Sequence, residues 1–189
     1  MALTAPNERA SSRRVRCLAT AALLGALTAA LGPLALPVEP VPITFQTFCV
    51  ALAALLLPAP WAAGSMALYV ALGAAGLPVF SKGQAGLSII VGPTGGYLAG
   101  FVIAAGLGAL VRTGLRQVGA RRVVADTGAG IVLMTVVYGV GTVWLARSLH
   151  LSLSQAAAAG VVPFVLGDAV KVGVAILIAE AVRKAGVRL

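Results

Sequence analysis

Asp168 and Lys171 are the residues whose types and spacing most clearly suggest chemistry. They are three positions apart in an otherwise apolar stretch, and Phe164 comes one helical turn before the aspartate. On an α-helix these side chains share one face. A carboxylate and an ammonium in apolar surroundings are costly to bury, so they normally contact a ligand, a cavity or each other. The spacing predicts a site for a polar ligand, and the alternative is an ion pair that only joins helices.

A second candidate segment has the sequence Pro-Ile-Thr-Phe-Gln-Thr at positions 42–47. Thr44 and Gln46 lie in it, and the glutamine amide is both a donor and an acceptor of hydrogen bonds. The segment precedes an apolar run, so both side chains are placed at the start of a predicted helix. They are therefore candidates for ligand binding, and the alternative is helix capping or packing.

A third candidate segment has the sequence Gly-Pro-Thr-Gly-Gly-Tyr at positions 92–97, just before another apolar run. Gly92 and Thr94 lie where a ligand could approach the free N–H groups of a helix N-terminus, which attract negative charge. Tyr97 is a candidate for lining a pocket, and the alternative is an aromatic anchor at the membrane interface.

Lys82 is the last candidate, in a glycine-rich loop over positions 78–93, and the alternative is a solvated loop charge. The sequence holds one histidine and two cysteines. None of them forms a metal-ligand spacing or a nucleophile cluster. We therefore expect no metal site and no enzymatic activity.

The composition indicates that lipid surrounds the elements that position these residues. Of 189 residues, 60% are hydrophobic and only 10% are charged, and the mean hydropathy is +1.02. A soluble fold could not cover itself with so little polar surface. Because a spanning helix needs about 20 residues, the chain has room for about six. We expect an all-α, polytopic membrane protein, a compact bundle of six transmembrane helices.

Prolines, glycines and charged segments divide the chain into these six spans. The first apolar run follows a basic N-terminal tail at 1–16, and a second tail occupies 184–189, so that one substrate-binding domain fills 17–183. The predicted spans are 17–36, 43–57, 61–77, 95–111, 123–145 and 161–182.

Basic residues gather between the apolar runs, which explains the net charge of +9 better than nucleic-acid binding does. With six spans and both termini in the cytoplasm, only Lys82 and Arg147 fall on outer loops. The cytoplasmic segments hold Arg9, Arg13, Arg14, Arg16, Arg112, Arg116, Arg121, Arg122, Arg183, Lys184 and Arg188. This asymmetry follows the positive-inside rule, so we expect both termini in the cytoplasm.

Small residues four apart occur in two of the spans and give flat faces for close helix packing. Gly96 and Gly100 form one such pair, for which we prefer packing within the chain. Ala22, Ala26 and Ala30 form the other set, on the first span.

Four sequence motifs, which follow one another along a chain with six predicted spans, resemble those of the BioY family. They are the segments 42–47, 73–80 and 92–98, followed by Gly167-Asp168-x-x-Lys171, and the resemblance covers about residues 18 to 183. BioY proteins are the biotin-binding S components of energy-coupling factor (ECF) transporters in prokaryotic cell membranes. Phe45 departs from the family pattern, which more often has leucine there.

The resemblance implies a protein that captures biotin from outside the cell. It also implies a transmembrane coupling protein and two ABC-type ATPases as partners, with ATP used only by those partners and no cofactor in this chain. Asp168 and Lys171 match the family's substrate-binding residues, and Ala22, Ala26 and Ala30 match its docking surface for the coupling protein. The sequence contains no Gly-x-x-x-x-Gly-Lys-Ser/Thr loop, so it lacks the usual ATP-binding motif.

Three alternatives remain open on the residues alone. The cargo could be another vitamin or a biotin precursor, because the motifs do not identify the ligand. The chain could be an intramembrane enzyme that uses Asp168 and Lys171 as acid and base, although it lacks a supporting cluster. It could also be a structural membrane protein without a small ligand.

Overall fold

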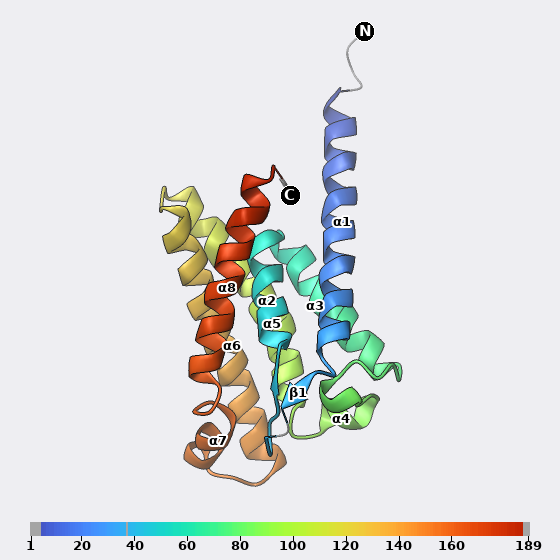
Figure 1. The fold of residues 1–189 in the computed structure, drawn as a ribbon, viewed down its shortest axis with the longest axis vertical. Helices are drawn as coiled ribbons and strands as arrows, with labels where there is room; N and C mark the ends of the chain where they lie inside the picture. The colour runs from blue at the N-terminus through green and yellow to red at the C-terminus, as the bar shows by residue number, and fades with distance from the viewer. Residues whose placement is uncertain (1–4, 37, 187–189) are drawn as a thin grey trace.

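The computed structural model describes residues 5–36 and 38–186, with side chains from residue 11 onward, and most of it is helical (Figure 1). The outermost parts of both predicted tails, 1–4 and 187–189, lie outside the described residues. The helices are α1 (Ala5–Leu31), α2 (Gln46–Leu56), α3 (Ala59–Ala74), α4 (Leu87–Val91), α5 (Gly95–Gln117), α6 (Arg122–Ser148), α7 (Leu153–Gly160) and α8 (Val165–Lys184), with a 3-10 helix η1 (Ser81–Gly83).

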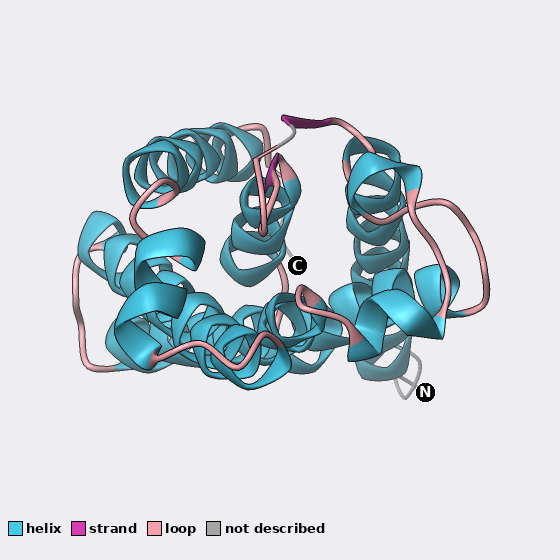
Figure 2. Cartoon of the chain, turned by 90° about the horizontal axis from the view of Figure 1, so that it is seen from below, coloured by secondary structure: helices cyan, strands magenta, loops and turns pink. Residues whose placement is uncertain are grey.

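Two short strands complete the described elements. β1 (Ala35–Leu36) pairs antiparallel with β2 (Ile43–Thr44), so that Ala35 lies opposite Thr44. These strands, α4 and α7 gather at one end of the bundle, whereas α1 begins and α8 ends at the other (Figure 1). Figure 2 views the first of these ends and shows the helices grouped side by side, with the strands among the connecting loops.

Fewer helices than the six predicted spans are long and apolar enough to cross a membrane by themselves. Among the described residues three qualify, over Ser11–Leu31, Gly95–Gln117 and Arg122–Ser148. α7 and α8 together would make a fourth, bent by 53° at their junction. α2 has 11 residues and α3 has 16, which is shorter than a typical span.

Prolines explain most of these boundaries. α2 ends at Leu56 because Leu57, which precedes Pro58, is extended (φ −97°, ψ 153°). α3 begins directly afterwards, with a proline in its first turn, where the missing N–H costs nothing. α8 begins at Val165 rather than at residue 161, because Pro163 lies in the turn after α7.

α1 and α5 are longer than predicted. α1 begins at Ala5, so most of the predicted polar tail is helical, and it ends at Leu31 rather than at residue 36. α5 continues to Gln117, which places Arg112 and Arg116 on the helix rather than in the predicted connection. Hydropathy indicates where a helix is apolar, whereas residues such as alanine and arginine let the helix continue beyond that point.

α2 forms the centre of the packing. Nine of its residues are buried, and it contacts α8, α5, α1 and α3. α5 and α6 contact each other most extensively, and a Cβ on Gly96 of α5 would lie 2.2 Å from the Trp144 Cβ of α6. Gly96 and Gly100 therefore pack within the chain, as predicted. α1 contacts α3, and Ser65 donates a hydrogen bond to the Ala21 carbonyl at 2.7 Å.

Candidate functional site

A cavity of about 270 Å³ lies at the end of the bundle that carries the strands. Its walls come from the β1–β2 connection, the start of α2, the loop around η1, the starts of α5 and α8, and the middle of α6. All nine ligand-binding candidates from the sequence line this one cavity: Thr44, Gln46, Lys82, Gly92, Thr94, Tyr97, Phe164, Asp168 and Lys171. The fold brings the candidates together, and their role in binding stays a prediction.

Asp168 and Lys171 form an ion pair in the cavity wall. The Lys171 ammonium lies 2.8 Å from Asp168 Oδ1, and the two side chains are 15% and 5% exposed. Tyr138 on α6 donates a hydrogen bond to Asp168 Oδ2 at 2.8 Å, and Lys171 also donates to the Thr44 carbonyl at 2.6 Å. Both carboxylate oxygens are thus engaged, which is how a buried charge becomes tolerable in an apolar bundle.

Gln46 belongs to a second hydrogen-bond network, which includes Thr44 and Tyr69. Its amide N–H donates to the Tyr69 hydroxyl, its carbonyl accepts from the Thr44 hydroxyl at 2.8 Å, and Tyr69 donates to the Val79 carbonyl at 3.2 Å. The Gln46 backbone N–H also donates to the Thr44 hydroxyl at 3.3 Å. The two residues therefore organise the start of α2 as well as lining the cavity.

Lys82 pairs with Glu39, across two loops at the edge of the cavity. Its ammonium lies 2.5 Å from Glu39 Oε1, and the side chains are 35% and 77% exposed. Lys82 has a positive φ of 58°, an uncommon conformation for a residue other than glycine. The lysine is thus held by a neighbouring carboxylate rather than simply solvated, and the pair joins the β1–β2 connection to η1.

Tyr97 is buried at the cavity rather than placed at a membrane interface. Its hydroxyl donates to the Gly160 carbonyl at 2.9 Å. A Cβ on Gly141 would lie 2.4 Å from the Tyr97 ring, and one on Gly160 would lie 2.0 Å from its hydroxyl. The ring therefore occupies space that only two glycines leave open between α6 and the end of α7.

The first turn of α5 faces the cavity as well. Thr94 is its N-cap residue and makes no capping hydrogen bond through its side chain. Gly95 is required there, because a Cβ would lie 1.7 Å from the Ile90 carbonyl oxygen. The partial positive charge of this helix end is thus directed at the cavity, where it favours a negatively charged ligand group.

The sequence interpretation missed several cavity or network residues, among them Glu39, Tyr69, Ser81 and Tyr138. Tyr138 could have been suspected, because a phenol within an apolar helix needs a hydrogen-bond partner. Ser81 Oγ is buried and has no hydrogen-bond partner among the described residues. No local pattern places Glu39 at the cavity or Tyr69 in the adjoining network, since their partners Lys82 and Gln46 are distant in sequence.

The arrangement suits a small ligand with both polar and apolar parts. Aromatic rings of Phe80, Phe101 and Phe164 supply apolar walls, and the polar groups are concentrated at a few points. The part of the chain that the structure describes contains no cluster of three or more metal-ligating residues.

Comparisons with known proteins agree with one another. The model of the BioY family matches residues 5–188. A biotin transporter BioY from Thermotoga maritima is 37% identical over 170 residues, which cover 90% of this chain and 97% of that protein. A probable biotin transporter BioY from Pyrococcus horikoshii is 36% identical over 84% of this chain and 91% of its own length.

A crystal structure of the S component for biotin from an ECF-type ABC transporter is also similar. Its TM-score is 0.83 at 26% sequence identity, and the match covers 92% of this chain and 93% of that one.

Proposed function

This chain belongs to the BioY family, and on that premise we propose that it is the biotin-binding S component of an ECF-type ABC transporter. The family transports biotin and is not a family of enzymes. The observation that carries the proposal is the Asp168–Lys171 ion pair, which lines a cavity together with all the other candidate residues.

Burial supports an orientation for biotin in the cavity. Asp168 is 4% exposed, and its carboxylate can accept hydrogen bonds from the two N–H groups of the ureido ring. The valerate carboxylate then extends toward Lys82, which is more exposed, and toward the first turn of α5. The fused sulfur ring packs against Phe164 and Tyr97, which are both buried and line the cavity.

We infer that the chain crosses the membrane six times, including α2 and α3. α2 has its N-terminus at the cavity, and the carbonyls of Leu55 and Leu57 near its C-terminus accept bonds from arginines at the opposite end. α3 returns from there to Gly73, which contacts the cavity residue Phe80. Each helix thus connects the two ends of the bundle despite its length.

The distribution of charge supports an outward-facing cavity with both termini in the cytoplasm. α1 begins and α8 ends at the end of the bundle away from the cavity, and the α5–α6 connection lies there too (Figure 1). Within the described residues, these segments, together with the end of α5 and the start of α6, hold ten of the fourteen basic residues of the sequence, so this end corresponds to the cytoplasmic side by the positive-inside rule. Biotin would therefore enter from outside the cell.

Energy for uptake would come from partners. We propose that a transmembrane coupling protein docks on α1 and that two ABC-type ATPases bind to it and hydrolyse ATP. Ala22, Ala26 and Ala30 support this docking face, because all three are exposed on the side of α1 away from its contacts within the chain. The substrate-binding domain would then be 17–183, with the tails 1–16 and 184–189 in the cytoplasm and no cofactor of its own.

Ligand binding by the purified, detergent-solubilised chain tests the proposal. We expect labelled biotin to bind, and unlabelled biotin to displace it better than dethiobiotin, riboflavin or thiamine does. A better competitor among these three would assign another cargo to the same cavity. If none of the four bound or raised the thermal stability, the proposed function would be wrong, because a tight ligand must stabilise the folded state.

A further inference from the structure

A second polar cavity, which we call the arginine pocket, lies at the opposite end of the bundle from the cavity that Asp168 and Lys171 line. It has a volume of about 250 Å³ and lies where α5 ends, α6 begins and α8 ends. Its lining residues are Arg112, Thr113, Arg116, Arg122, Asp126 and Arg183. Four guanidinium groups thus line one small space with a single carboxylate.

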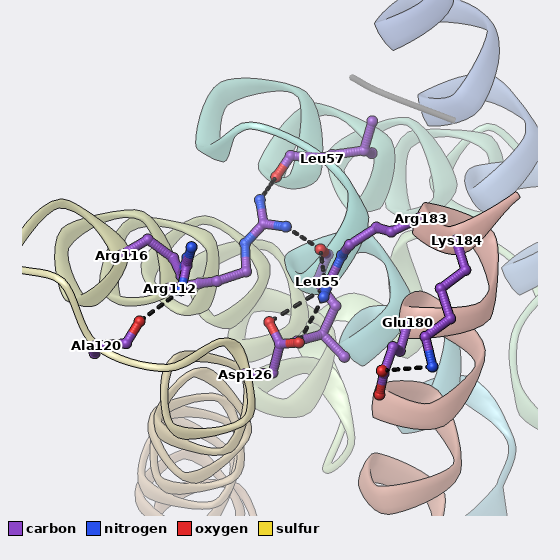
Figure 3. Close-up of polar contacts among 9 residues, drawn as sticks. All are labelled: Leu55, Leu57, Arg112, Arg116, Ala120, Asp126, Glu180, Arg183 and Lys184. Carbon is purple, nitrogen blue, oxygen red and sulfur yellow. Dashed lines mark hydrogen bonds and ion pairs between the residues drawn. The ribbon is translucent and has the colours of Figure 1, made fainter. Parts of the chain in front are cut away.

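The hydrogen bonds of the pocket leave most of this positive charge unbalanced (Figure 3). Arg183 donates to both Asp126 oxygens, at 2.7 and 3.2 Å. Arg112 donates only to the backbone carbonyls of Leu55 and Leu57 in the described structure. Arg116 donates to the Ala120 carbonyl at 2.6 Å. Within the described residues, only Arg183 of the four pairs with a carboxylate.

Glu180, the other carboxylate drawn in this region, reduces the excess of positive charge without removing it. Glu180 lies 2.9 Å from the Lys184 ammonium and also interacts electrostatically with Arg183 and Arg122, so five basic residues here face two carboxylates (Figure 3). Arg112 and Arg183 have a structural role, because they satisfy carbonyls at the C-terminal end of α2. In the described part of the chain, the hydrogen bonds to the end of α2 come from Arg112 and Arg183, so that role does not explain the position of Arg116 and Arg122 on the pocket.

The surroundings of the pocket indicate where its ligand comes from. Val118, Val123 and Val124 lie within two positions of the pocket residues Arg116 and Arg122 in sequence and are 80%, 63% and 54% exposed. Exposed valines beside arginines, at the ends of membrane-spanning helices, are typical of the boundary between acyl chains and head groups. A basic pocket at this depth presents its donors to phosphate groups of the membrane.

We propose that the arginine pocket binds the phosphate group of an anionic phospholipid, with the acyl chains beside the exposed valines. Guanidinium groups match phosphate oxygens in paired hydrogen bonds, and Asp126 is the one carboxylate among the lining residues. A phospholipid head group and free phosphate both offer negatively charged phosphate oxygens to the arginines. The exposed valines beside the pocket favour the lipid. The inference does not depend on which molecule the opposite cavity binds.

The test uses the full chain in detergent and follows its thermal unfolding during titration with short-chain lipids. The probes are phosphatidylglycerol, phosphatidylcholine with the same chains, and inorganic phosphate. The pocket variant is Arg116→Gln with Arg122→Gln, which spares the two arginines bonded to α2. The matched control is Arg14→Gln with Arg121→Gln, which removes the same charge from two exposed positions that do not line the pocket.

We expect phosphatidylglycerol to stabilise the wild-type chain and the control, and to bind the pocket variant about 30-fold more weakly, since two arginines near a head group are lost. An unchanged circular dichroism spectrum and thermal midpoint in the absence of lipid would show that the pocket variant is folded. Equal effects of the two double variants would overturn the proposal in favour of diffuse charge attraction. Stabilisation by inorganic phosphate at similar concentrations would retain the phosphate site and overturn the lipid as its source.

Discussion

The ammonium of Lys171 donates a hydrogen bond to the backbone carbonyl of Thr44 at 2.6 Å, although the two residues are 127 positions apart. The same ammonium contacts Asp168, so one side chain connects the aspartate on α8 to the start of α2. The ion pair therefore has two possible functions, ligand binding and helix attachment. The predictions below separate them.

Replacing Asp168 by asparagine keeps the shape of the side chain and removes its charge. Lys171 then has no counter-ion at this buried position, and the ureido N–H groups of biotin lose a charged acceptor. We expect the Kd for biotin to rise at least about 100-fold, as for other broken buried charge pairs. Isothermal titration calorimetry measures this change. The matched control is Glu180→Gln, which breaks an exposed pair on the same helix and should leave the Kd nearly unchanged.

The double variant Asp168→Asn with Lys171→Met distinguishes ligand binding from helix attachment. Lys171→Met alone leaves a buried aspartate without its cation and should destabilise the fold by about 3–5 kcal/mol. The double variant has no unpaired charge, so we expect its thermal stability to recover most of that loss without any recovery of biotin binding. Wild-type biotin affinity in the double variant would show that the pair only joins helices.

Tyr138→Phe removes one hydrogen bond to the Asp168 carboxylate and little else. Hydrogen bonds to charged groups contribute about 1.5–3 kcal/mol, so we expect biotin binding to weaken by about tenfold or more. Thr135→Val is a suitable control, because it removes an exposed hydroxyl of α6 that bonds only its own helix at 2.9 Å. If both variants bound biotin like the wild type, the Tyr138 contact would have no part in the site.

Gly141→Ala tests the packing of Tyr97. The added methyl group would lie 2.4 Å from the aromatic ring, so the ring must move, and we expect a loss of about 1–3 kcal/mol of stability together with weaker biotin binding. Gly139→Ala on the same helix has no atom within 4 Å of the new methyl group. Alanine favours the helix there, so stability should stay equal or rise slightly. Equal thermal midpoints for the two variants would contradict this packing.

The sequence predicted the parts of the site that depend on local spacing. Asp168 and Lys171 are one helical turn apart, so their pairing follows from helix geometry alone. Glu39 and Tyr138 could not be assigned in the same way, because their partners Lys82 and Asp168 belong to other elements. Such contacts depend on how the helices are arranged, which spacing along one segment does not specify.

The fold was predictable to a similar extent. Apolar runs located the long helices α5 and α6, and the prolines at 58 and 60 marked the break between α2 and α3. Hydropathy did not predict that α1 begins at Ala5, since a helix can continue through polar residues. Nor did it indicate that Pro163 separates a short α7 from α8 at an angle of 53°, because both helices are apolar.

The eleven-residue length of α2 has a consequence for how this chain can vary. Gln46 at its first position bonds Tyr69, and Leu55 near its last accepts hydrogen bonds from Arg112 and Arg183. One inserted residue would rotate everything after it by about 100° and advance it by about 1.5 Å. Either the Gln46 side-chain amide or the Leu55 backbone carbonyl would then lose its hydrogen-bond partners. α2 thus acts as a spacer of set length, and relatives that differ in length should differ in their loops instead.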